Sequence, residues 1–237
     1  MAQQHGKNYR AALEKVEPGR LYPPQEAVEL VRETAASGRF DPTVEAHLRL
    51  GIDPRHADQT VRTTVVLPHG TGKTRRIAVF ATGEKAREAT EAGADLVGGE
   101  DLVKQVQAGQ IDFDVALATP DVMGLVGRIG KVLGPRGLMP NPKAGTVTFE
   151  IAKAIREVQG GRIEVRNDRL GNIHAPIGKA SFDDAKLRDN FAALMEAVVR
   201  AKPSAAKGTF VKTVTLCTTH GPGVKVDPSQ ASKLQVA

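Results

Sequence analysis

The sequence predicts a mixed α+β protein with two domains. Its 237 residues suit one large domain or two smaller ones, and two fit better. The middle of the chain alternates strand-like and helix-like runs, a pattern typical of an α/β layer. The two flanking parts each hold few apolar residues for a core of their own, which permits one domain built from both ends.

The first part of the chain contains two helical patterns and then a strand pattern. Apolar residues recur at helical spacing over 8–16 and 24–35, and Pro23-Pro24 stands where a helix can begin. From Thr43 to Ile52 apolar and polar residues alternate, which predicts a half-buried strand with one polar face. The polar positions of that face are Thr43, Glu45, His47 and Arg49.

From Arg62 onward, strand-like and helix-like runs follow one another. The strand-like runs are 62–67, 76–81, 94–97 and 113–118, and the helical runs are 84–92, 100–108, 121–127 and 150–158. This alternation favours parallel strand pairing. Pro68-His69-Gly70 and Gly160-Gly161 resemble the two borders of this segment.

The last part returns to strands at 162–166 and 172–177, followed by an amphipathic helix at 184–201 and strands at 209–218 and 223–226. A second polar strand face is carried by Arg162, Glu164 and Arg166. Solvent exposure is the ordinary explanation for both polar faces. We expect the polar tail 227–237 to be frayed.

The stretch Gly127–Val147 fits neither a helix nor a strand pattern. It holds five glycines, three prolines, four basic residues and no acid, so a long shaped loop is expected. Val132, Leu133, Leu138 and Met139 would hold it against a core. Its bases Arg128, Lys131, Arg136 and Lys143 form either a second basic surface or a connection with merely solvated charges.

The composition favours an anionic partner in a reducing compartment. Lys+Arg exceed Asp+Glu by six, and residues 161–237 carry twelve bases against seven acids. The single cysteine, Cys217, excludes an internal disulfide and a Cys-rich zinc site, and its strand position suggests a buried apolar residue. No signal peptide and no apolar run of membrane-spanning length is present, so we expect a cytoplasmic protein without a membrane partner.

Enzymatic motifs are incomplete. His69-Gly-Thr-Gly-Lys-Thr74 ends like a phosphate-binding loop, but Leu67 stands where its first glycine is required and no clear helix follows. Gly124, Gly127 and Gly130 do not have the spacing of a dinucleotide fingerprint. The six histidines occur singly, never at metal-ligand spacing on a helix. No metal, cofactor or catalytic residue is therefore predicted.

Several segments resemble one family throughout most of the chain. They are KVLGPRGLMPNPKAGTV from Lys131, FDPTVE from Phe40, GIDPR from Gly51, AGADLVGG from Ala92, ATPDVM from Ala118, RND from Arg166 and HAPIGK from His174. In this order they are similar to the bacterial ribosomal protein L-one family, from about residue 7 to about residue 226. The resemblance implies an α+β RNA-binding domain from residues 1–68 and 161–237, and an inserted Rossmann-like α/β domain at 69–160.

The resemblance also implies a set of residues that contact ribosomal RNA. On this chain they are Phe40, Thr43, Glu45, Arg166, Asp168, His174, Lys179, Thr219, His220 and Gly221. Arg and Lys can hold phosphates, whereas Thr and carboxylates can bind base amines and ribose 2′-hydroxyls. Two departures occur: His220 stands where relatives commonly have Met, and Pro42 stiffens the turn before Thr43. Phe40 keeps an alternative role as a core anchor.

The implied function is non-enzymatic. A member of this family binds large-subunit ribosomal RNA at the mobile stalk, assists release of deacylated tRNA from the exit site, and represses translation of its own operon messenger RNA. It would be monomeric when free and act in the cytoplasm within the large ribosomal subunit. Two other classes stay open at this point: a nucleotide-dependent enzyme using Lys73, and a repressor that never enters ribosomes.

Overall fold

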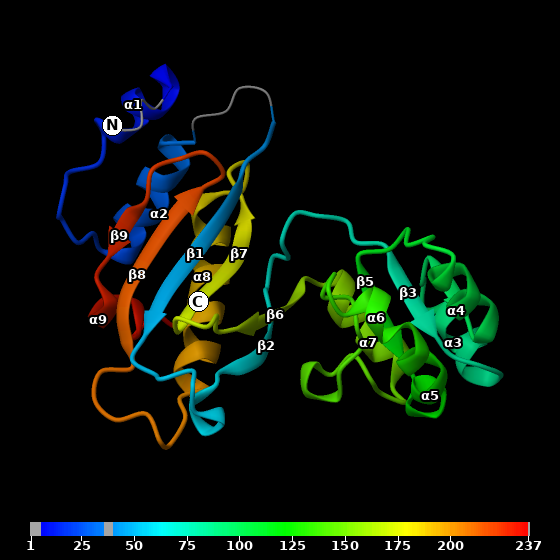
Figure 1. Cartoon of the computed structure of the whole chain (residues 1–237). Coiled ribbons are helices and arrows are strands. Elements are labelled where there is room, and N and C mark those ends of the chain that lie inside the picture. The colour runs from blue at the N-terminus through cyan, green and yellow to red at the C-terminus, as the bar shows by residue number, and fades with distance from the viewer. Residues whose placement is uncertain (1–5, 36–39, 237) are drawn as a thin grey trace. The chain divides into compact units, whose positions relative to one another are not determined.

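The computed structural model describes residues 6–35 and 40–236, without the side chain of Lys143. The chain folds into two compact units. The first unit contains the residues up to Gly72 and those from Ile163 onward, and the second contains Lys73–Arg162. Figure 1 shows the elements of each unit.

A four-stranded antiparallel sheet organises the first unit. Its strand order is β7-β1-β8-β9, and the strands span Asn172–Lys179 (β7), Thr43–Leu50 (β1), Val211–Thr218 (β8) and Val224–Val226 (β9). Ala46 lies opposite Ala175 on one side and Leu216 on the other. The sheet therefore combines β1, from the first part of the sequence, with three strands from the last part.

Two helices cover one face of this sheet. They are α2 (Pro24–Glu33) and α8 (Asp184–Arg200), and both lie behind the sheet in Figure 1. Leu48 of β1 and Leu187 and Phe191 of α8 are among the fully buried residues of the shared core. Each such side chain contributes about 1.5–3 kcal/mol when it leaves water. The burial leaves the other sheet face outward, as the alternation in the sequence predicts.

The remaining elements of the first unit are shorter. They are helix α1 (Lys7–Leu13), a 3₁₀ turn at Ala57–Gln59 (η1), and strands β2 (Arg62–Val66) and β6 (Arg162–Arg166), which form a two-stranded sheet. Fully buried Asn190 of α8 accepts a hydrogen bond from His69 N and donates to the carbonyls of Gly70 and Ile177. It thereby fixes the turn that follows β2.

The second unit is an α/β layer with parallel pairing, as predicted. Its sheet has the order β4-β3-β5, with β3 at Ile77–Phe80, β4 at Leu96–Gly98 and β5 at Val115–Ala118. One core cluster joins the sheet to α4 (Glu100–Gln107) and the segment 122–133. A second cluster joins it to α3 (Glu84–Glu91) and α7 (Ile151–Gln159).

The stretch 127–147 is only partly the loop that the sequence predicts. Residues 120–133 form consecutive helical turns: η2 (Pro120–Val122), α5 (Met123–Val126), η3 (Gly127–Ile129) and α6 (Gly130–Leu133). Buried Ile129 and Leu133 outweigh the poor helix propensity of the glycines, so the loop prediction was wrong for 127–133. Beyond Leu133 the chain is irregular apart from η4 (Pro142–Ala144) and a bridge between Ala118 and Val147. The four apolar residues of this stretch pack against the core as predicted; they are Val132, Leu133, Leu138 and Met139.

The tail also differs from the sequence-based expectation. Asp227 accepts a hydrogen bond from Ser229 N and caps a short helix, α9 (Pro228–Ala231). Ala231 is fully buried in the core of the first unit, so this part of the tail is docked, not frayed. Among residues 6–35 and 40–236 no helix has the length and apolar character needed to cross a membrane.

Candidate nucleic-acid interface

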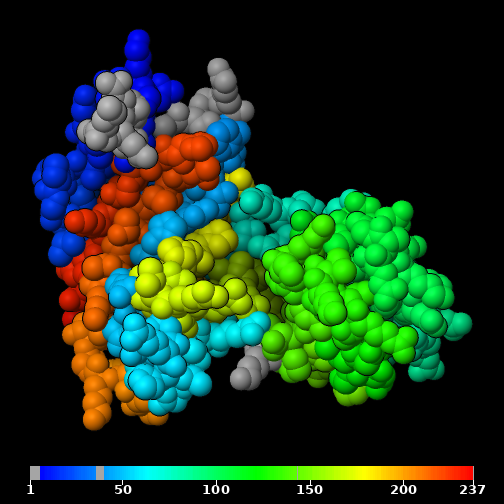
Figure 2. Space-filling model, in the orientation of Figure 1, coloured from blue at the N-terminus to red at the C-terminus, as the bar shows by residue number. Residues whose placement is uncertain are grey.

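The outward face of the four-stranded sheet is lined by polar side chains. On β1 these are Thr43, Glu45, His47 and Arg49, with Lys179, Pro176, His174 and Asn172 opposite them on β7. On β8, Cys217, Thr215 and Thr213 lie opposite Glu45, His47 and Arg49. Figure 2 shows orange atoms of β8 and blue atoms of β1 at the surface on this side. We call this surface the outward sheet face.

One end of this face is a cluster of hydrogen bonds around Thr43. The Lys179 Nζ atom donates to Asp41 O at 2.9 Å and to Thr43 Oγ1 at 3.3 Å. Thr43 N donates to Thr219 Oγ1 at 3.3 Å, and Thr219 N donates to Thr43 O at 3.0 Å. These bonds hold three strand ends together and fix the directions of two hydroxyls and one ammonium group.

The turn after β8 completes this end. His220 has φ +66°, an uncommon conformation for a residue with a side chain, and its ring meets that of Phe40 edge-on at 6.1 Å. Phe40 is 48% exposed, so its alternative role as a core anchor was wrong. A Cβ atom on Gly221 would lie 2.1 Å from Thr218 Oγ1, so this position accepts no side chain without rearrangement.

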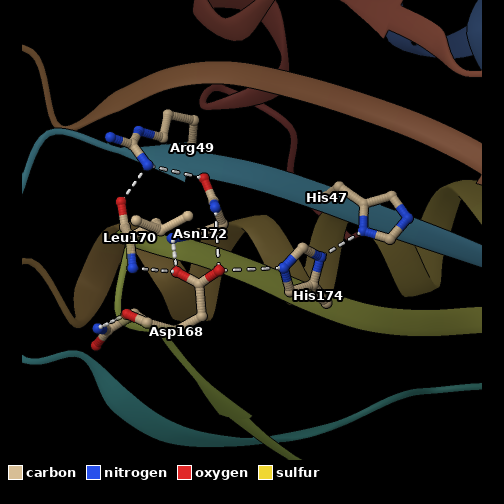
Figure 3. A network of polar contacts seen from close by, with 7 residues as sticks. His47, Arg49, Asp168, Leu170, Asn172 and His174 are labelled. Atoms are coloured by element: carbon tan, nitrogen blue, oxygen red, sulfur yellow. Dashed lines mark hydrogen bonds and ion pairs between the residues drawn. The ribbon is translucent and has the colours of Figure 1, made fainter.

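Asp168 organises the loop between β6 and β7. Its Oδ1 accepts hydrogen bonds from Leu170 N at 2.8 Å and Asn172 N at 2.7 Å, and its Oδ2 accepts one from Asn172 Nδ2 at 3.0 Å. Figure 3 shows this network, which Arg49 joins through Leu170 O and Asn172 Oδ1. The hydrogen bond from the backbone N–H of Asn172 is the main cause that lowers the pKa of Asp168 from 3.8 to about 2, against the opposing effect of burial.

Two histidines that the sequence separates widely meet at the centre of the outward sheet face. His47 Nδ1 lies 2.7 Å from His174 Nδ1, and His47 Nε2 lies 3.1 Å from Cys217 Sγ. The sequence interpretation found no signal for this contact, because only the β1–β7 register creates it. It also misplaced Cys217, which is half-buried on the polar face, since Val214 and Leu216 take the buried positions of β8.

The structure brings eight of the ten residues implied by the resemblance onto the outward sheet face or its end. They are Phe40, Thr43, Glu45, His174, Lys179, Thr219, His220 and Gly221. Asp168 lies beside them, 3.6 Å from His174 Nε2. Arg166 is apart, exposed at the end of β6 in the two-stranded sheet.

The bases predicted as a possible second basic surface belong to the other unit. Arg128, Lys131 and Arg136 are exposed on or just after η3 and α6, whereas the side chain of Lys143 is outside the described residues. The segment Lys73–Thr74 leads to β3 through residues without helical structure. A phosphate-binding loop of the kind considered for Lys73 would require a helix there.

Comparison with known proteins gives one consistent result. Residues 31–222 match the model of the Ribosomal protein L1p/L10e family. The chain is 60% identical over 234 residues to the large ribosomal subunit protein uL1 of Chloroflexus aurantiacus (strain J-10-fl), covering 98% of each sequence. It is 62% identical over 226 residues to the protein of the same name from Chloroflexus aggregans, covering 94% of this chain and 95% of the relative.

Proposed function

The chain belongs to the ribosomal protein L1p/L10e family, and on this premise we propose that its outward sheet face binds ribosomal RNA at the mobile stalk of the large subunit. The family is structural and RNA-binding, so the protein is a constituent of the large ribosomal subunit and not an enzyme. The subunit is also its cellular location. The proposal concerns which surface and which side chains contact the RNA.

The hydrogen-bonded cluster at the end of the face is the observation that carries this proposal. Buried Thr43 holds Lys179 and Thr219 in fixed positions, where they present one ammonium group and one hydroxyl, and the exposed ring of Phe40 lies against His220 at the same end. Preorganised groups lose little conformational entropy on binding, which favours recognition of one RNA shape over another. Side chains on a sheet face that only contacts solvent have no functional requirement for such a hydrogen-bonded arrangement.

The proposed roles follow from the chemistry of each group. Lys179 and exposed Arg166 hold phosphate oxygens, whereas Glu45 accepts hydrogen bonds from ribose 2′-hydroxyls or exocyclic amines. Gly221 lets the backbone approach the RNA closely, since no side chain projects there. Asp168 acts as a positioning residue, because its carboxylate oxygens accept hydrogen bonds from its own loop.

The wider proposal extends to tRNA and messenger RNA. The residues 1–68 and 161–237 would form the ribosomal-RNA-binding domain, and 69–160 the inserted domain that moves with the stalk as deacylated tRNA leaves the exit site. The exposed bases Arg128, Lys131 and Arg136 would contact that tRNA. The same outward sheet face would bind a similar fold in the protein's own operon messenger and repress its translation. The free protein would act as a monomer.

Binding to a transcript of the large-subunit stalk RNA, titrated across salt beside a scrambled duplex of equal length, tests the main proposal. We expect the stalk RNA to stay bound at salt concentrations that release the duplex. Glu45→Ala and Thr219→Ala should each weaken specific binding by about 1–3 kcal/mol. Glu29→Ala is the matched control, because it removes an exposed carboxylate from α2 on the other side of the sheet.

Two results would contradict this placement of the site. Parental affinity in both variants would mean that the end of the sheet does not contact the RNA. Equal release of stalk RNA and duplex with salt would leave a basic protein without shape recognition.

A further inference from the structure

The contact between His47 and His174 requires that only one of their two Nδ1 atoms carries a proton. At 2.7 Å the two Nδ1 atoms form a hydrogen bond, so one carries a proton while the other offers its lone pair. Figure 3 shows the two rings facing each other between β1 and β7. The pair can therefore exist as two neutral rings or as one neutral and one charged ring, but not with both rings charged in this geometry.

The partners of the two Nε2 atoms, one on each ring, are compatible with two neutral histidines. Burial, with a smaller effect of Glu45, raises the pKa of the Cys217 thiol, which therefore keeps its proton at neutral pH. That thiol can donate to His47 Nε2 at 3.1 Å, so His47 Nδ1–H donates to His174. His174 Nε2–H then points to Asp168 Oδ2 at 3.6 Å. Each polar atom of this row has a partner before any proton is added.

One added proton preserves the Nδ1 hydrogen bond, whereas a second would set two N–H groups against each other. Burial first, and then the neighbouring His174, lower the pKa of His47, while Glu45 at 3.7 Å opposes this shift. His174 is the more exposed ring, with a side-chain exposure of 54% against 30% for His47. In the neutral pair an incoming proton enters at His47 Nε2, which until then accepts from the Cys217 thiol, and the His47 Nδ1 proton can then move to His174 Nδ1, so that the positive charge is shared by both rings beside the Asp168 carboxylate.

The charged and titratable groups around the pair come from each neighbouring element. Glu45 and Arg49 lie on β1, Asp168 on the preceding loop and Cys217 on β8, while Arg49 is directed to Leu170 O and Asn172. In the described part of the chain no three His, Cys, Asp or Glu side chains are arranged to hold a metal ion.

We propose that the His47–His174 pair lies against the RNA backbone and that RNA binding is accompanied by uptake of a single proton shared by the two rings. The inference rests on the RNA-binding function of the outward sheet face and adds His47 to its contacts. Phosphates close to the pair stabilise its cationic form, so bound RNA favours the extra proton. By linkage, affinity must then rise as the pH falls.

The expected size of the effect follows from the count of one proton. Where the pair is neutral without RNA and charged with it, the association constant changes by up to about ten-fold per pH unit. The measured range, about pH 6 to 8, includes the ordinary imidazole pKa near 6.5 and extends above it. A plot of the logarithm of the association constant against pH should therefore have a slope that approaches −1 but never −2, as expected for a pair that takes up one proton.

The measurement is the affinity for the stalk RNA transcript at constant ionic strength from pH 6 to pH 8. His220 also lies at the RNA-binding end, so the variants compared with the parental chain all carry His220→Gln, which removes this ionisable side chain. The test variant adds His47→Gln and His174→Gln, which keep hydrogen-bonding groups but cannot take up a proton in this range. The control adds His56→Gln, which removes an exposed histidine from the loop after β1. Tyrosine fluorescence verifies that each chain is folded.

We expect the slope in the His220→Gln chain and in the His56 control, and a flat profile in the chain without the pair. Calorimetric titrations in two buffers of different ionisation enthalpy should independently give an uptake of up to one proton. A flat profile in the His220→Gln chain, or the same slope after removal of the pair, overturns the inference. A slope near −2 overturns it too, because the rings would then titrate independently.

Failure of the RNA-binding proposal itself would give a different experimental result. If the parental chain, with His220 intact, binds the transcript no better than the scrambled duplex at any pH, the outward sheet face is not a specific RNA site and both proposals fail. If the transcript binds specifically but without pH dependence, only the shared proton is refuted.

Discussion

Replacing Asp168 by Asn should destabilise the first unit in a pH-dependent manner. The carboxylate accepts hydrogen bonds from Leu170 N and from both the backbone and side-chain nitrogens of Asn172. An amide of the same shape keeps one acceptor oxygen, but its NH₂ group would face a hydrogen-bond donor. The loop that joins β6 to β7 thereby loses at least one bond and the negative charge that strengthens the others.

The magnitude can be worked out from the pKa of Asp168, which the loop lowers from 3.8 to about 2. One pKa unit corresponds to about 1.4 kcal/mol, so the upper limit is about 2.5 kcal/mol. The Asp168 side chain is 35% exposed and solvent weakens its interactions, so we expect about 1 kcal/mol at pH 7.

The sign follows from the lowered pKa. A depressed carboxylate pKa contributes stability that is complete above the unfolded value near 3.8 and disappears as the pH falls through about 2. About half of the difference between parent and variant should be lost by pH 3. Both proteins should be compared at pH 7 and pH 3.

Tyrosine fluorescence during urea unfolding is a suitable assay. The chain has no Trp and two Tyr, Tyr9 and Tyr22, and both belong to the first unit. Tyr22 is only 2% exposed, so its environment changes on unfolding. The signal therefore reports the unit that contains Asp168, without a contribution from the second unit.

Asp53→Asn is the matched control. Its carboxylate accepts one backbone hydrogen bond, from Arg55 N at 3.1 Å, and we expect a change within about 0.5 kcal/mol. Equal destabilisation by Asp168→Asn at pH 7 and pH 3 would refute the electrostatic argument. A change at pH 7 no larger than the control would show that the loop does not depend on this carboxylate.

Three further predictions concern the turn, the core and the second basic surface. Gly221→Ala should weaken stalk RNA binding at least about ten-fold, since its Cβ would collide with Thr218, whereas Gly223→Ala, whose Cβ would lie 3.0 Å from a methyl group, should change affinity less. Asn190→Ala should lower the free energy of unfolding by about 3 kcal/mol, because it removes three hydrogen bonds to backbone groups, of which the one to Ile177 O is buried and the other two are part-buried; a loss below about 1 kcal/mol in urea titrations would contradict this. Alanine at both Arg128 and Arg136 should lower the salt slope of tRNA binding by up to about two phosphate equivalents, and an unchanged slope would exclude contact.

The sequence alone determined most of the secondary structure and the family. Alternating residues predicted β1 with its polar face, and the runs after Arg62 predicted the parallel strands β3, β4 and β5. These patterns are local, since side chains alternate on a strand and repeat every 3.6 residues on a helix. Such a pattern is visible within a single segment, so it can be recognised without knowing which other segment packs against it.

Local rules failed where packing decided the outcome. Gly127–Leu133 is helical despite its glycines because Ile129 and Leu133 reach the core of the second unit. Asp227 and buried Ala231 hold a helix in a tail that looked merely polar. In both places buried apolar contacts exceed the few tenths to one kcal/mol by which propensities differ.

The tertiary structure by itself decided which residues meet. The register of β1 against β7 places His47 on His174 across 127 positions of sequence, and that against β8 places Cys217 beside Glu45. The hydrogen bonds among Thr43, Lys179 and Thr219 likewise join strands from both ends of the chain. Neither register can be read from one strand, because each depends on how the buried faces of neighbouring strands pack against α2 and α8.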